Sequence, residues 1–334
     1  MALKLVGPDF FDLSALLSEE EIAIQNMTND WVKNRFYPLI SSHYREGTFP
    51  FELQKEMGEM GFFGSTLPEK YGTAGINGVA YGLMMQELER GDSGLRSFAS
   101  VQGSLVMWPI WKYGSDEQKE KWLPLLASGE IIGCFGLTEP DYGSNPGGMI
   151  TRVKQEADKF ILNGTKMWIT NSPVADVAII WAKDEAGEVR GFLVERGTPG
   201  FETPEIKGKL SLRASVTGEI VLNNCEIPLE NQLPEADGLR APLSCLTQAR
   251  YGINWGVMGS AIACYEEAVE YAKTRIQFDK PIAAFQLTQQ KLAEMLNEIT
   301  KAQFLTLQLG RLKDRETLNH KQVSLVKMNN VRMA

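Results

Sequence analysis

The chain has 334 residues, 43% of them hydrophobic, which is enough for two or three domains with buried cores and excludes a disordered or fibrous class. Its formal net charge of -8 combines charges of both signs without a basic stripe, so nucleic acid is not an expected partner. No apolar run reaches the roughly 18 residues of a membrane helix, so no membrane partner is expected.

Residues 1–130 are predicted to form an N-terminal helical domain. Ser18-Glu-Glu-Glu21 has the capping-box pattern of a helix start. Helical apolar spacing follows in three stretches separated by turn signals: 51–60, 81–89 and 116–126. Residues 1–21 are acidic and contain no arginine, which argues against a secretory signal or a transit peptide. We expect a bacterial cytoplasmic protein, or a mitochondrial-matrix protein without its transit peptide if the source is eukaryotic.

Residues 131–238 are predicted to form a middle antiparallel β domain. The apolar runs become short and β-type here, and Gly, Asn, Asp and Pro punctuate them. The expected strands lie within residues 134–137, 149–156, 159–170, 177–182, 191–195 and 218–222.

Residues 239–334 are predicted to form a C-terminal helical bundle. In the stretch 286–312 the apolar side chains recur near a period of 3.6: Leu292, Met295, Leu296, Ile299 and Leu309. Residues 321–334 keep helical spacing without a Gly, Asn or Pro stop signal. We therefore expect the chain to end inside a helix and the bundle to be incomplete. Helices, sheet and helices in this order predict an α+β fold.

The sequence lacks the motifs of several kinds of catalytic and metal-binding site. The four cysteines have no metal spacing and are expected to be buried free thiols: Cys134, Cys225, Cys245 and Cys264. Neither His43 nor His320 has a nearby triad or metal pattern, so no metal site is expected. GxSxG, GxxxxGK[ST] and GxGxxG motifs are absent too. These absences leave cofactor chemistry as the main possibility.

Two segments, Cys134–Ser144 and Gly164–Asn171, place small hydrogen-bonding residues and an aromatic side chain where strand-like runs end. Such a surface suits a planar polar ligand. Taken singly, Trp168 fits a core aromatic, and Thr138 and Ser144 fit turn residues. Taken together, the segments resemble the flavin-binding signature of the acyl-CoA dehydrogenase family. The resemblance extends over nearly the whole chain, and it implies that family's fold with FAD as the cofactor.

The resemblance also implies which residues contact the flavin. They are Phe135, Gly136, Leu137, Thr138, Glu139, Ser144, Trp168, Ile169 and Thr170. Thr138 would hydrogen-bond to the ring, and the Thr170 hydroxyl would lie near N5. Arg275, Phe278 and Gln286 resemble the stretch that reaches the FAD of a neighbouring subunit, which implies a homo-oligomer arranged as a dimer of dimers. Without the family, Arg275 fits a cation that complements a helix C-terminus.

A second implied site binds the acyl-CoA substrate. Ser144 and a run of residues would line the coenzyme A channel: Leu243, Ser244, Cys245, Leu246, Thr247, Gln248, Ala249 and Arg250. A solvent-facing arginine is the alternative for Arg250. In glutaryl-CoA dehydrogenases an Arg-Ser pair at the position of Arg96 and Ser97 holds the distal carboxylate of the substrate, and a glutamate at the position of Glu89 supports it. The alternative for Arg96 is a surface pair with Asp92.

The implied activity is that of an FAD-dependent glutaryl-CoA dehydrogenase of amino-acid catabolism. It would combine α,β-dehydrogenation with decarboxylation to crotonyl-CoA and pass electrons to an electron-transfer flavoprotein. The family's base is a glutamate in a Tyr-Glu-Gly-Thr motif, which is absent here, so we expect it beyond Ala334 and assign it to none of Glu139, Glu294 and Glu298. The alternatives are a dehydrogenase for another short or branched acyl-CoA and a non-catalytic, truncated homologue that binds FAD or acyl-CoA.

Overall fold

The structure, a computed structural model, describes residues 8–334, which divide into two compact units. The helical unit comprises residues 8–38, Asn77–Arg96 and Arg250–Ala334. The sheet unit comprises Leu39–Ile76 and Ser97–Ala249. The predicted domain boundaries at residues 130 and 238 stay predictions.

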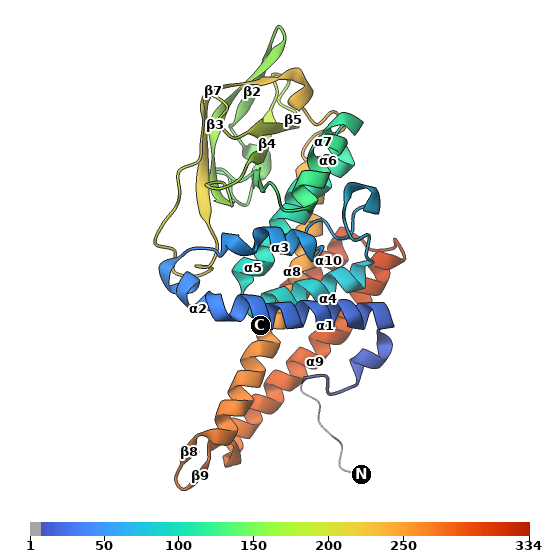
Figure 1. Ribbon diagram of the computed structural model, residues 1–334, viewed down its shortest axis with the longest axis vertical. Helices are drawn as coiled ribbons and strands as arrows, with labels where there is room; N and C mark the ends of the chain where they lie inside the picture. Colours follow the sequence, from blue (N-terminus) through green and yellow to red (C-terminus); the bar gives the residue numbers. More distant parts are fainter. Residues whose placement is uncertain (1–7) are drawn as a thin grey trace. The chain divides into compact units, whose positions relative to one another are not determined.

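The helical unit is assembled from three separate stretches of the chain. It contains α1 (Glu19–Trp31), α4 (Gly78–Gly91), α8 (Arg240–Thr274) from Arg250 onward, α9 (Gln286–Asp314) and α10 (His320–Met333). A short hairpin of β8 (Ile276–Gln277) and β9 (Lys280–Pro281) joins α8 to α9, and the two helices run antiparallel (Figure 1). The apolar stripe predicted for α9 is buried in part, since Ile299 packs in a core cluster with Met258 and Ile262 of α8.

Glycines allow α4 and α8 to pack with their backbones in close approach. Gly252, Gly256 and Gly259 lie three or four residues apart on α8 and therefore share one face of that helix. A Cβ at Gly252 would lie 2.9 Å from the hydroxyl of Tyr81, and a Cβ at Gly259 would overlap the backbone carbonyl of Gln86. Larger residues on this face would therefore force the two helices apart.

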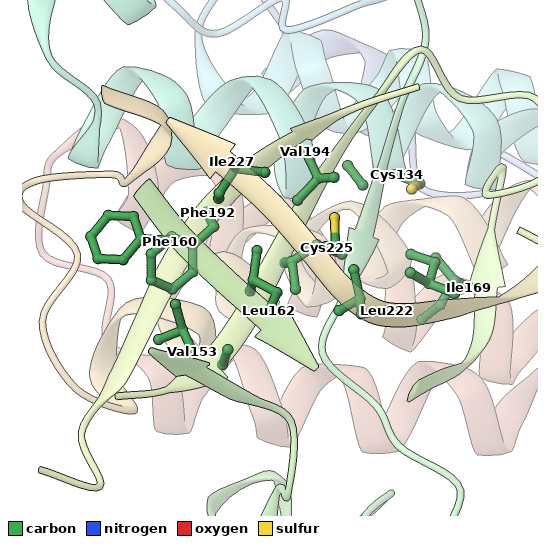
Figure 2. Close-up of a cluster of buried hydrophobic side chains, with 14 of the residues drawn as sticks. Cys134, Val153, Phe160, Leu162, Ile169, Phe192, Val194, Leu222, Cys225 and Ile227 are labelled. Atoms are coloured by element: carbon green, nitrogen blue, oxygen red, sulfur yellow. The ribbon is translucent and has the colours of Figure 1, made fainter. Parts of the chain in front are cut away.

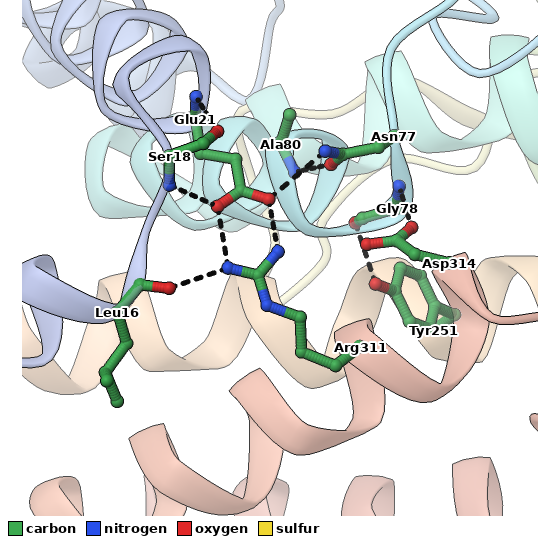
Figure 3. Close-up of polar contacts among 9 residues, drawn as sticks. All are labelled: Leu16, Ser18, Glu21, Asn77, Gly78, Ala80, Tyr251, Arg311 and Asp314. Atoms are coloured by element: carbon green, nitrogen blue, oxygen red, sulfur yellow. Dashed lines mark hydrogen bonds and ion pairs between the residues drawn. The ribbon is translucent and has the colours of Figure 1, made fainter.

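A buried carboxylate, Glu21, connects the two ends of the helical unit (Figure 3). It completes the predicted capping box, because Ser18 N donates to Glu21 Oε2 over 2.9 Å and Glu21 N donates to Ser18 Oγ over 3.2 Å. It also accepts from Arg311 NH2 over 2.9 Å and from Asn77 Nδ2 over 3.1 Å. Burial favours the protonated acid, but the hydrogen bonds and charge of Arg311 and the Ser18 N–H outweigh it and lower the pKa of Glu21.

The sheet unit contains a seven-stranded sheet with helices around it. Its helices are α3 (Gln54–Glu59), α6 (Trp108–Tyr113) and α7 (Asp116–Ala127), while α2 (Tyr37–Glu46) and α5 (Ser93–Ser100) contribute residues to both units. The strand order is β1-β4-β2-β3-β7-β6, and β5 pairs with β4. The strands are β1 (Gly133–Gly136), β2 (Arg152–Glu156), β3 (Lys159–Thr170), β4 (Val177–Lys183), β5 (Val189–Glu195), β6 (Phe201–Glu202) and β7 (Thr217–Pro228).

The sheet is mixed, which corrects the prediction of an antiparallel β domain in one respect. Four pairs are antiparallel as expected: β2 with β3, β3 with β7, β4 with β5 and β6 with β7. However, β1 pairs with β4 in parallel. The first residue of β2, Arg152, also pairs in parallel with β4, at Lys183. The β2–β3 hairpin lies between β1 and β4 in sequence, and this long connection lets the chain return to run beside β1 in the same direction.

The core of the sheet unit consists of side chains from alternate strand positions (Figure 2). Phe160 and Leu162 of β3 face inward, and Leu222, Cys225 and Ile227 of β7 lie with them. Phe160 meets Phe192 of β5 edge to face, with ring centroids 5.2 Å apart. The core therefore joins β3 with β7, which are neighbours in the sheet although three strands separate them in sequence.

Three of the four cysteines are buried free thiols as predicted, namely Cys134, Cys225 and Cys245. The prediction is wrong for Cys264, which is exposed on the outer face of α8 together with Glu267 and Tyr271, three and seven residues further on. Within residues 8–334, no helix is long and apolar enough to cross a membrane. The same residues contain no group of three or more His, Cys, Asp and Glu residues that could hold a metal ion.

Candidate functional site

The two motif segments lie side by side in the sheet unit. The first leaves β1 at Gly136, and the second is the last part of β3. The backbone connects them directly, because Met167 N donates to the carbonyl oxygen of Thr138 over 2.8 Å. Residues about thirty positions apart in sequence therefore form one continuous surface.

A β-bulge turns Trp168 toward solvent. Lys166 pairs with Ile220 and Ile169 pairs with Gly218, so β3 has one residue more than β7 between these pairs. Trp168 lies in the bulge with a left-handed φ of 61°, and 61% of its surface is exposed. An exposed indole in a strained backbone conformation is unusual for a structural aromatic, and such strain is typical of functional sites.

The predicted flavin contacts separate into two groups by burial. Phe135, Leu137 and Ile169 are at most 8% exposed and belong to the interior of the sheet unit, so only their backbones can meet a ligand. Thr138 and Thr170 are half-buried and Ser144 is exposed. Within the described part of the chain, no residue hydrogen-bonds to these three hydroxyls, so each is available to a ligand.

Glu139 and Lys166 form a buried ion pair beneath this surface. Lys166 is 0% exposed, and its Nζ donates to Glu139 Oε1 over 2.9 Å and to the Leu137 carbonyl over 3.2 Å. Glu139 also accepts from the backbone N–H groups of Ile150, over 2.7 Å, and Thr151, over 3.0 Å. The sequence analysis assigned Lys166 no role. Its position was a signal, because residues 160, 162 and 166 lie on the same face of β3, and a lysine on the face that carries Phe160 and Leu162 is expected to be buried.

The electrostatics of the pair follow from its burial. Burial lowers the pKa of Lys166 to about 8, and the Glu139 carboxylate only partly offsets that effect. For Glu139, burial raises the pKa, but the Ile150 N–H and the Lys166 charge outweigh it, so the pKa of Glu139 is lowered overall. The pair is therefore charged at neutral pH.

In the helical unit, Arg96 forms an ion pair with Glu89. Arg96 Nε donates to Glu89 Oε2 over 2.6 Å, and the two side chains are 12% and 3% exposed. Ser93 Oγ donates to the other carboxylate oxygen over 2.9 Å. Gly256 of α8 makes room for the pair, since a Cβ there would overlap Glu89 Oε2 and lie 3.1 Å from Arg96 Nε. The role of Gly256 was missed because the spacing of the glycines on α8 predicts close helix packing but does not identify the side chains that lie against each of them.

The alternative partner of Arg96, Asp92, forms no ion pair with it within the described residues, although burial raises the pKa of Asp92 and the Arg96 charge acts in the opposite direction. Asp92 Oδ1 accepts a hydrogen bond from the backbone N–H of Gly94 over 2.6 Å. Among residues 8–334, no partner is found for the terminal guanidinium nitrogens of Arg96. They remain able to bind a planar anion with two parallel hydrogen bonds. Ser97, predicted to act beside Arg96, begins the part of α5 that belongs to the sheet unit and is half-buried.

The segment predicted to line the coenzyme A channel forms the start of α8. Leu243 is 38% exposed, whereas Cys245 and Ala249 are buried. Burial raises the pKa of the Cys245 thiol to about 12, so it stays protonated. Ser244 shares a 2.7 Å hydrogen bond with the hydroxyl of Tyr113, and Thr247 Oγ1 donates to the Leu243 carbonyl over 3.1 Å. Leu246, Gln248 and Arg250 are half-buried, and Arg250 is the first residue of α8 in the helical unit.

The residues predicted to reach a neighbouring subunit lie at the hairpin between α8 and α9. Arg275 and Gln286 are exposed, and 86% of the Phe278 surface is accessible. Phe278 has a left-handed φ of 51° and contacts the edge of Phe285, whose face carries the Lys280 ammonium at 4.4 Å. This tip presents aromatic and cationic groups together.

Comparisons with known proteins agree with this arrangement. Models of the N-terminal, middle and C-terminal domains of acyl-CoA dehydrogenases match residues 18–130, 134–225 and 236–334. The chain is 37% identical to a glutaryl-CoA dehydrogenase of Desulfococcus multivorans, covering 91% of this chain and 80% of that protein. It is 36% identical to an acyl-CoA dehydrogenase of Bacillus subtilis, with 93% and 83% covered.

Solved structures give the same result. A glutaryl-CoA dehydrogenase from Mycobacterium smegmatis superimposes with a TM-score of 0.96 at 53% identity, covering 98% of this chain and 84% of that one. Butyryl-CoA dehydrogenase from Megasphaera elsdenii superimposes with a TM-score of 0.91 at 31% identity, with 95% and 85% covered. The chain belongs to the acyl-CoA dehydrogenase family.

Proposed function

We propose that this chain is an FAD-dependent acyl-CoA dehydrogenase that acts on glutaryl-CoA. The observation that carries the substrate assignment is the buried ion pair of Arg96 and Glu89. Glu89 uses Nε and leaves the terminal guanidinium nitrogens for a second carboxylate, which a dicarboxylic acyl chain supplies and an uncharged chain does not. Similarity to glutaryl-CoA dehydrogenases at 37% and 53% identity supports the same choice.

The residues of the sheet unit fit a flavin. Thr138, Thr170 and Ser144 offer hydroxyls without partners among residues 8–334, Trp168 offers an exposed aromatic face, and a Cβ on Gly143 would meet nothing within 4 Å. We assign them to the ring and its ribityl chain. A related glutaryl-CoA dehydrogenase of Mycobacterium smegmatis, 52% identical over 98% of this chain, was solved in complex with FADH2. When bound, FAD would accept a hydride from the acyl thioester.

The chain's own residues would bind and orient the substrate. Arg96 would fix the distal carboxylate, Ser144 and the run from Leu243 to Arg250 would hold the coenzyme A part, and Trp168 would shield one face of the ring from water. We assign the general base to none of residues 1–334. We further propose a homotetramer in which Arg275, Phe278 and Gln286 reach the neighbouring flavin, an electron-transfer flavoprotein as electron acceptor, and a cytoplasmic location in a bacterium.

Substrate selectivity tests the assignment. In the protein loaded with FAD, Arg96→Ala should reduce kcat/KM for glutaryl-CoA roughly 30-fold or more, as expected from about 2–5 kcal/mol for a buried charge pair. Turnover of butyryl-CoA should change less than a few-fold. Arg315→Ala, at an exposed arginine of the same unit, is the control. Equal losses on both substrates would remove Arg96 from carboxylate recognition.

A further inference from the structure

The buried lysine beneath the candidate flavin surface has more contacts with the two motif segments than a packing role requires. Lys166 Nζ binds the Leu137 carbonyl and the Glu139 carboxylate, which flank Thr138 on both sides. The Thr138 carbonyl in turn accepts from Met167, the residue next to Lys166. Three consecutive residues of the first segment are therefore fixed by two consecutive residues of the second.

The loop that follows is fixed by the same pair. The Glu139 carboxylate accepts from the backbone N–H groups of Ile150 and Thr151, at the entry to β2. This closes the loop from Pro140 to Met149, which carries Ser144, against the end of β1. One carboxylate and one ammonium thus hold the positions of Thr138, of the Ser144 loop and of the bulge that carries Trp168.

The surrounding residues are arranged to admit the lysine. A Cβ on Gly136 would lie 3.2 Å from Lys166 Cγ and 2.8 Å from Ile180 Cδ1, so the absence of a side chain there gives the lysine stem its passage. Stability alone does not require a charged pair at this place, because well-packed apolar residues of similar volume often stabilise a protein as much as a buried ion pair does, or more. A function in setting geometry explains why charge is used here.

We propose that Lys166 and Glu139 are positioning residues of the flavin site, which hold the Thr138 hydroxyl and the Trp168 indole in the arrangement that binds the cofactor. The inference rests on the proposed function, since it needs FAD as the ligand. Neither residue need touch the cofactor, because Lys166 is 0% exposed and Glu139 2% exposed. Both act through the backbone that carries the contacting groups.

The test compares two lysines of the same strand. Lys159 of β3 forms an exposed ion pair with Glu226 over 2.8 Å, so Lys159→Met is the matched control for Lys166→Met. The readouts are the dissociation constant of FAD, the visible absorption and circular dichroism of the bound flavin, kcat, KM and the thermal midpoint. For Lys166→Met we expect at least a tenfold weaker FAD affinity, an altered flavin spectrum and a lower kcat with KM changed less than twofold. Lys159→Met should match the wild type in all of them.

A second variant separates an effect on FAD binding from a general loss of folding. Lys166→Met leaves Glu139 buried without its cation, so it is paired with Lys166→Met/Glu139→Gln, which removes both charges and keeps one side-chain acceptor oxygen where the carboxylate offered two to the Ile150 and Thr151 N–H groups. We expect the double variant to regain part of the thermal stability lost in the single variant, but not FAD affinity or the native flavin spectrum. A folded single or double variant with wild-type affinity and spectrum would reduce the pair to a structural contact. Failure of the wild type itself to bind FAD would instead contradict the proposed function.

Discussion

Two buried carboxylates, Glu21 in the helical unit and Glu139 in the sheet unit, are held in similar ways over very different distances in sequence. Each accepts from backbone N–H groups, one for Glu21 and two for Glu139, and from one cation. The cation of Glu139 is 27 residues away, whereas that of Glu21 is 290 residues away. Lys166 is 0% exposed, and the Arg311 side chain is 29% exposed.

The difference shows how the two units depend on the chain. In the sheet unit, the pair of Glu139 and Lys166 joins two segments of the chain that pack directly on each other, and both segments lie within residues 135–170. The helical unit obtains its contacts from both ends of the chain, with α1, α4 and α9 meeting at Glu21, Asn77 and Arg311 (Figure 3). A perturbation of the helix contacts should therefore act on distant segments, and one in the sheet should stay local.

The largest effect should come from Gly259→Ala. The new Cβ would overlap the Gln86 carbonyl, and backbone atoms in two packed helices cannot move aside as a side chain can. We expect the free energy of unfolding to fall by about 3–5 kcal/mol. Hydrogen exchange should show lost protection in α4, α8 and α9, with the β3–β7 ladder still protected. Gly143→Ala, at a position with nothing within 4 Å, is the control, and equal loss in the sheet would break the comparison.

A smaller effect is expected from Arg311→Met. Breaking a buried pair costs about 3–5 kcal/mol, and the partial exposure of Arg311 reduces this to about 1–3 kcal/mol. Because the folded pKa of Glu21 is lowered, its contribution is present above its ordinary pKa of 4.5 and is lost as the pH falls through the folded value. Acid titration of stability should therefore be less steep in the variant. Arg315→Met is the control. If the unfolding free energy of Arg311→Met falls with decreasing pH as steeply as that of the wild type, the Glu21–Arg311 pair does not contribute to acid stability.

A pH-dependent effect, present only at alkaline pH, concerns the Lys166 pair. Between its folded pKa of about 8 and its ordinary value of 10.5, the unfolded chain binds one more proton at Lys166 than the folded chain does. The contribution of Lys166 to unfolding free energy therefore rises with pH in this window, by at most about 1.4 kcal/mol per unit. Chemical denaturation at pH 7, 8, 9 and 10 should show this slope as the difference between wild type and Lys166→Met. No difference in slope would mean that Lys166 titrates as an exposed lysine does.

Much of the fold was predictable because local patterns agree with the final contacts. The capping box at Ser18 and Glu21 is present, and the strand expected over residues 159–170 matches β3 residue for residue. The partners of Glu21 at Asn77 and Arg311 were not predictable, since nothing in a helical pattern identifies a contact 290 residues away. The parallel pairing of β1 with β4 was missed for a similar reason, because strand periodicity gives no direction of pairing.

The candidate site shows the same division. The motif segments around Thr138 and Trp168 were identified from residue type, and the structure brings them together through Met167 N and the Thr138 carbonyl. The residues underneath were not identified, because Lys166 and Glu139 matter through burial and hydrogen bonding rather than through a motif. Gly256 belongs to the same class, since its importance lies in the carboxylate that occupies the space beside it.

The discontinuous helical unit has a consequence for how the protein is made. During synthesis α1 leaves the ribosome first, followed by residues 39–76 of the sheet unit and then α4, and the rest of the sheet unit, residues 97–249, is made before residues 250–334 exist. The sheet unit can fold as it emerges, since domains fold as units during translation. Helix α4 buries twelve of its fourteen residues, from Gly78 to Glu89. Part of that surface packs on α1, which is made earlier, and the part that packs on α8 and α9 stays uncovered until those helices are made. The nascent chain at this stage therefore exposes apolar helix surface that the finished protein buries.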